Sequence, residues 1–160
     1  MAALDIVVTH ALAWALVLLF ALVLGGQVFD AFVLVPIWSD HPPESVDGWL
    51  GTPAANRVPR YFMRLLSPLL VVSLAALACG LLTRAAGRGW LLGAAACGVA
   101  HLALVRIFFV PTNQALGFLP SQSGDAGPDK VRLVRDWLRW NSVRLALDLL
   151  GLLASVNAVS

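Results

Sequence analysis

Charge is what this sequence lacks most. Of its 160 residues only 12% are charged and 59% are hydrophobic, with a mean hydropathy of +0.82. Soluble domains carry about 25% charged residues. The composition therefore excludes an ordinary water-soluble protein and predicts a lipid bilayer as the surroundings of the chain. A net charge of +2 is too small to indicate nucleic acid as a partner.

Several signals of other protein classes are also missing. No Lys or Arg precedes Arg57, so the first apolar run lacks the basic start of a signal peptide and is expected to be a retained helix. The two cysteines, Cys79 and Cys97, fall inside apolar runs and form no disulfide framework. Without a CxxC, HExxH or Gly-rich phosphate loop, the sequence predicts neither a metal site nor a nucleotide site.

The sequence does contain four apolar runs, each long enough to cross a bilayer as a helix. We expect one membrane domain, residues 1–160, that is all-α and folds as an antiparallel four-helix transmembrane bundle. The predicted helices cover about residues 4–38, 60–83, 90–116 and 129–158. They leave two long loops on one side, residues 39–59 and 117–128, and a short turn at Arg84–Arg88 with both termini on the other.

Basic residues are concentrated on the side of the long loops. By the positive-inside rule these loops are cytoplasmic, in an integral protein of a bacterial cytoplasmic membrane. Trp38, Trp49 and Trp90 are interpreted as anchors at the membrane interface. A homo-oligomer is compatible with the sequence.

Charged residues inside a membrane are costly and mark sites or helix contacts. Counting 1.5 Å per residue, His101 and Asp148 both lie roughly 20 Å from the side of the termini, so they can meet. Arg144, Arg106 and Arg64 follow at about 24, 27 and 30 Å. His10 lies at a different depth from His101, which disfavours a haem held between two histidines.

The polar residues of three helices are spaced to share faces. In the last helix the stripe follows steps of four, three and four through Trp137, Asn141, Arg144 and Asp148. Arg106 and Asn113 are seven residues apart in the third helix, and Arg64 lies in a similar row in the second. Three inward arginines would leave positive charge in excess and favour a phenolate, enolate or carboxylate ligand. The alternatives are that these arginines extend to the interface, or that Arg144 and Asp148 only join helices.

Two segments carry a family resemblance: FVPTNQAL at 109–116 and WLRWNSVRLAL at 137–147. Together they resemble a small four-helix membrane family, mostly of unknown function, that includes the fungal anthrone oxygenases. Its motif residues here are Val110, Pro111, Asn113, Trp137, Trp140, Asn141 and Arg144. One departure is Ser142, where family members often carry His.

The resemblance implies oxidation of an anthrone by O₂ without a metal or flavin cofactor, on a hydrophobic phenolic or anionic substrate. In that reading His101 and Asp148 transfer protons, Arg144 and Arg106 hold the anion with Arg64, and Asn113, Asn141, Trp137 and Trp140 contact the substrate. A non-catalytic protein that binds lipid or a hydrophobic ligand, or a small subunit of a membrane complex, remains the alternative. A transporter is less favoured because we find no internal repeat.

Overall fold

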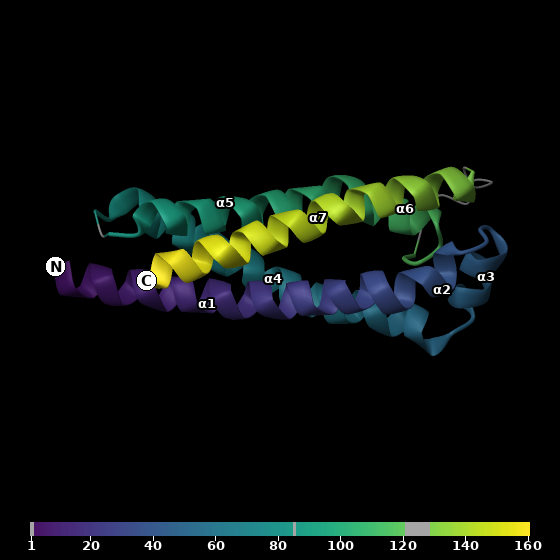
Figure 1. Ribbon diagram of the computed structural model, residues 1–160, viewed down its shortest axis with the longest axis horizontal. Helices are drawn as coiled ribbons and strands as arrows, with labels where there is room; N and C mark the ends of the chain where they lie inside the picture. The colour runs from purple at the N-terminus through teal and green to yellow at the C-terminus, as the bar shows by residue number, and fades with distance from the viewer. Residues whose placement is uncertain (1, 85, 121–128) are drawn as a thin grey trace.

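Four long apolar helices make up the fold (Figure 1). The computed structural model describes residues 2–84, 86–120 and 129–160. Its segments long and apolar enough to cross a membrane confirm the predicted all-α bundle: Ile6–Ser39, Pro53–Leu82, Arg88–Ala115 and Lys130–Val159. The elements in chain order are α1 (Ala2–Phe29), η1 (Asp30–Leu34), α2 (Val35–Ser39), α3 (Glu44–Leu50), α4 (Pro53–Leu82), α5 (Arg88–Leu104), η2 (Val105–Phe109), α6 (Val110–Ala115) and α7 (Lys130–Val159).

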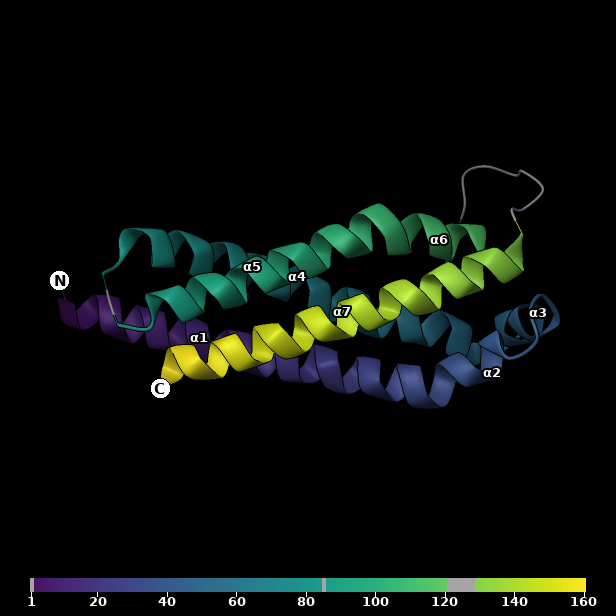
Figure 2. The same cartoon turned by 45° about the horizontal axis from the view of Figure 1, so that its top comes forward.

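The four long helices form a closed antiparallel ring. α1 lies beside α4 and α7, and α5 lies beside the same two helices. Both termini lie at one end of the bundle, while α2, α3 and α6 lie at the other (Figures 1 and 2). We call the end with the termini the near end and the opposite one the far end.

The first helix and α7 each bury a narrow stripe of residues spaced alternately three and four residues apart. On α7 the stripe is Val134, Trp137, Asn141, Arg144, Asp148, Gly151, Ser155 and Ala158. On α1 it is Thr9, Ala13, Leu16, Phe20, Val23 and Gln27, and it continues to Asp30 of η1. A seven-residue period is that of helices packed at a shallow crossing angle. The other faces expose large apolar residues, as contact with lipid requires.

Small residues bring the helices together in the near half. A Cβ at Gly151 would overlap the ring of Phe20, and a Cβ at Gly98 would overlap Ser73 Oγ. Gly80 lies against Leu92, whose side chain would be 2.8 Å from a Cβ at that position. The near half is therefore a close-packed contact of backbones.

The far end differs from the predicted loop over residues 39–59. That segment contains α3, and α4 begins at Pro53 rather than near residue 60. Proline fits the first turn of a helix because its missing N–H needs no partner there, and Thr52 Oγ1 caps the turn by accepting from Ala55 N at 3.4 Å. Pro59 then lies inside α4, although it indicates a break when read alone. In the second predicted loop, residues 121–128 lie outside the described residues.

Two π-helical turns, η1 and η2, interrupt α1 and α5 in the far half. A π-turn bonds each residue to the one five positions away, so it holds an extra residue and shifts the face that later residues occupy. On the first helix the buried stripe accordingly steps five residues, from Asp30 to Val35, before it continues at Trp38. Such turns are frequent at functional sites.

Candidate functional site

A cavity of about 810 Å³, its open mouth included, lies among the helices of the far half. Its wall is mainly apolar and includes six aromatic side chains: Trp38, Trp49, Phe62, Phe109, Phe118 and Trp137. The polar residues that line it are Asp30, His101, Asn113 and Arg144. We call this cavity the chamber. A largely apolar space of this size with a few polar groups is typical of small-molecule sites.

His101 and Asp148 form a buried pair at the near end of the chamber. His101 Nδ1 lies 2.7 Å from Asp148 Oδ1, and the side chains are 1% and 0% exposed. The prediction that the two residues meet is confirmed. His101 lines the chamber and Asp148 stands behind it. Because Asp148 occupies Nδ1, Nε2 is the nitrogen left to act on a ligand.

Arg144 places a buried positive charge in the chamber wall. Its Nη2 donates to Asn141 Oδ1 at 2.7 Å, and its guanidinium carbon lies 4.4 Å from the centre of the Phe109 ring. The ring of Phe62 lies 5.6 Å away on the same guanidinium. These cation–π contacts and the amide hold the group in one place. Asp30 and Asp148 are its electrostatic partners.

Trp137 and Asn113 connect α7 to α6 at the far end. Trp137 Nε1 donates to Asn113 Oδ1 at 3.0 Å, and the indole packs edge-on against Trp38 with 4.9 Å between centroids. Since the amide oxygen of Asn113 is used, its NH₂ group is the part that can donate to a ligand. Both residues line the chamber.

Arg64, Arg106 and Trp140 do not join the chamber. All three side chains are exposed, and none lines the cavity. Arg106 lies within the π-helical turn η2, so Arg106 and Asn113 no longer share the face that a regular seven-residue spacing gives them. The predicted cluster of three inward arginines is therefore wrong: of these three, Arg144 alone is buried. The predicted excess of positive charge is not formed, because Asp30 lines the same chamber as Arg144 and Asp148 pairs with His101 behind the wall.

Two further residues of α7 differ from the roles their motif implies. Asn141 is buried, but it is bonded to Arg144 and does not line the chamber. Ser142 is exposed on the opposite face of the helix, where its Oγ bonds to Leu138 O at 3.4 Å. A histidine at this position of this chain would therefore point away from the chamber.

Two wall residues, Trp38 and Trp49, are missing from the sequence-based site. The sequence does allow Asp30 as a second acidic residue beside the arginines, and in the structure it is only 7% exposed and lines the chamber. Trp38 and Trp49 are not interface anchors, because both are buried in the chamber wall. Two contacts hold α3 against the bundle. Ser45 Oγ donates to Trp38 O at 2.8 Å, and Asp47 forms an ion pair with Lys130.

Within residues 2–84, 86–120 and 129–160, no three His, Cys, Asp or Glu side chains gather as a metal site would require.

No curated protein and no solved structure matches the chain. A family model described as anthrone oxygenase matches residues 56–154, which include α5 to α6 and nearly all of α4 and α7. Since this match covers more than half of the sequence and the helices that carry His101, Asn113, Trp137 and Arg144, the chain belongs to the anthrone oxygenase family.

Proposed function

We propose that this membrane protein oxidises an electron-rich aromatic compound of the anthrone type with O₂, using the side chains of the chamber. The observation that carries the proposal is the meeting of a buried histidine–carboxylate pair and a buried guanidinium on one aromatic cavity. The pair supplies a base, and the guanidinium supplies a fixed positive charge for the anion that deprotonation creates. The family match supports this chemistry.

The first step is proton transfer to His101. An anthrone carries an acidic ring CH₂ beside its two arenes, and Nε2 of His101 takes one of its protons. Asp148, whose Oδ1 lies 2.7 Å from Nδ1, orients the imidazole and stabilises the imidazolium, so Asp148 is a positioning residue. Arg144 and the amide of Asn113 then stabilise the oxygen of the resulting enolate.

The second step is the reduction of O₂ by this anion. One electron passes to O₂, and the radical pair combines at the ring carbon to give a peroxide, which takes the proton held by His101. His101 then removes the second proton of that carbon while the O–O bond breaks. The departing hydroxide receives this proton as water, and a carbonyl remains. The CH₂ group loses four electrons and one O₂ gains them, so O₂ is the only co-substrate proposed.

The test is O₂ uptake by the purified, lipid-reconstituted protein supplied with an anthrone. The wild type should consume one O₂ per quinone formed, and Arg144→Ala should lose about 10²–10³-fold in rate, the usual effect of removing a group that stabilises an oxyanion. Arg106→Ala is the matched control, because Arg106 is exposed outside the chamber. It should keep its activity.

Thermal unfolding separates a catalytic loss from a folding loss in Arg144→Ala. Arg144→Lys provides a second comparison, since it keeps the charge but not the planar donor group. A fully active Arg144→Ala would refute the assignment of this residue. Wild-type uptake no faster than the spontaneous reaction, with the anthrone still bound, would indicate a non-catalytic binding protein instead.

A further inference from the structure

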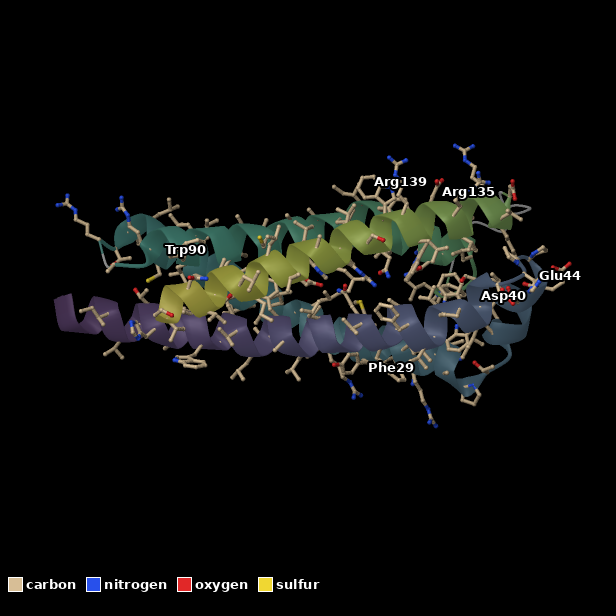
Figure 3. The ribbon with its side chains drawn as sticks, viewed as in Figure 1. Phe29, Asp40, Glu44, Trp90, Arg135 and Arg139 are labelled. Atoms are coloured by element: carbon tan, nitrogen blue, oxygen red, sulfur yellow. The ribbon has the colours of Figure 1, made fainter. Side chains whose placement is uncertain are left out.

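A second cavity, of about 730 Å³ with its open side included, lies between the first helix and α4. Its outer part is formed by Phe29 and Tyr61, which are 55% and 43% exposed on the membrane-facing surface. Figure 3 shows Phe29 pointing away from the bundle. Its inner part is formed by Asp30, Val58 and Phe62, and these three residues also line the chamber. We call this second cavity the side groove.

The local sequence keeps the side groove open. No residue of α4 between Ala55 and Leu69 is buried, so the two helices do not close on each other here. Gly26 leaves room for the ring of Tyr61, whose Cε1 would lie 2.6 Å from a Cβ at that position. The Tyr61 hydroxyl donates to Leu22 O at 3.0 Å, which keeps the ring along α1 rather than across the groove.

We propose that the substrate enters the chamber sideways from the bilayer, through the side groove, and that it enters as the neutral molecule. This inference rests on the proposed function, because it takes the ligand to be a neutral, phenolic polycyclic aromatic. Such a compound partitions into the hydrocarbon region, which the exposed side of the groove faces. Phe62 stands between the two cavities, with its ring 5.6 Å from the guanidinium of Arg144.

Charge at the inner boundary selects the neutral form. The side groove alone is lined by one cation, Arg57, whereas Asp30 lies at the boundary that both cavities share. A second negative charge passing Asp30 in a medium of low dielectric would be repelled. The anion is therefore made only inside, when His101 takes the proton, and the total charge of the chamber does not change in that step. This order agrees with the finding that Arg144 already has two carboxylates as partners.

The experiment measures binding kinetics in lipid vesicles with 1,8-dihydroxyanthraquinone, a coloured quinone that cannot be oxidised further at the reacting carbon. Leu34→Trp adds bulk to the side groove at a residue that does not line the chamber. Phe32→Trp is its control, since Phe32 is 77% exposed on the same π-helix and lines neither cavity. In Leu34→Trp the association and dissociation rates should both fall about tenfold with the Kd unchanged, because a route affects both directions equally. Phe32→Trp should behave as the wild type.

A widening variant tests the same route without added bulk. Tyr61→Ala should raise both rates, again at constant Kd. Unchanged rates in both Leu34→Trp and Tyr61→Ala would overturn the lateral route while leaving the proposed function intact. Failure of the wild type to bind the quinone would overturn both proposals. Slowed binding in Leu34→Trp, together with no O₂ uptake by the wild type, would support the route and refute the oxygenase alone.

Discussion

The near half and the far half of this bundle are built from the same buried stripes, yet one is packed solid and the other encloses a chamber. The near half places small residues opposite a large one, as where Gly98 and Gly151 surround Phe20. The far half places large aromatics on all sides, with Trp38, Phe109 and Trp137 edge to face. Seven-residue periodicity thus sets which face is buried, and residue size sets whether that face closes.

The largest expected effect in the far half is the loss of its base. His101→Gln should reduce the rate of O₂-dependent oxidation by about 10²–10⁴-fold, the usual contribution of a positioned general base. His10→Gln is the matched control, because His10 is exposed on α1 in the near half. Single-turnover oxidation of an anthrone measures both variants. Equal loss in the two would show that the chamber histidine has no special role.

Substitutions in the near half should destabilise the fold by overpacking, and they should not act on the proposed reaction. Gly151→Ala puts a Cβ into the ring of Phe20 and should lower the free energy of unfolding by about 1–3 kcal/mol, measured by thermal unfolding in detergent. Gly25→Ala, which meets nothing within 4 Å, should be neutral or stabilising. Adding Phe20→Leu to Gly151→Ala should restore part of the loss. No difference between the two glycine variants would contradict the close packing described here.

A smaller effect is expected where the chamber wall depends on one hydrogen bond. Asn113→Ala removes the acceptor of Trp137 Nε1 and should cost about 0.5–1.5 kcal/mol in stability, with a comparable loss in quinone affinity. Calorimetric titration of 1,8-dihydroxyanthraquinone measures the affinity. Asn157→Ala is the control, since Asn157 is exposed in the near half and bonds only within its own helix. Equal quinone affinity in Asn113→Ala and Asn157→Ala would show that Asn113 is not part of the binding site.

The smallest effect is expected at position 142, where the family resemblance implies His in place of Ser142. Ser142→His adds a base to the exposed face of α7, so its effect on stability and oxidation should stay within about 0.5 kcal/mol. The pH profile of the oxidation rate provides the measurement. A large gain in rate would mean that α7 turns its outer face to a substrate, against the arrangement in the chamber.

Figure 3 illustrates which part of this could be read from the sequence. Arg135 and Arg139 point outward from α7, as a helix with one inward stripe requires, and regular counting along that helix correctly placed Trp137, Arg144 and Asp148. Hydropathy alone located the four spans, because length and apolarity are sufficient for that.

Counting residues along a regular helix predicted the wrong face where the helix was not regular. It also missed contacts between segments that are far apart in the sequence. The π-helical turn η2 changed the face of Arg106, and no residue pattern in that segment announced it. Arg64 lies on a regular helix, but spacing within α4 does not say which of its faces meets another helix. Trp49 entered the chamber wall because α3 folds against the bundle through pairs far apart in sequence, such as Lys130 with Asp47.

The distribution of the six tryptophans has a spectroscopic consequence. Trp38, Trp49 and Trp137 are buried in the chamber wall, whereas Trp14, Trp90 and Trp140 are exposed on the outer surface. The intrinsic fluorescence of the unlabelled protein therefore divides into two populations of equal number. A coloured ligand in the chamber would quench the first most strongly, because energy transfer falls steeply with distance, and brominated lipid would quench the second by collision. One optical experiment can thus report on the occupancy of the chamber and on the lipid contact of the bundle separately.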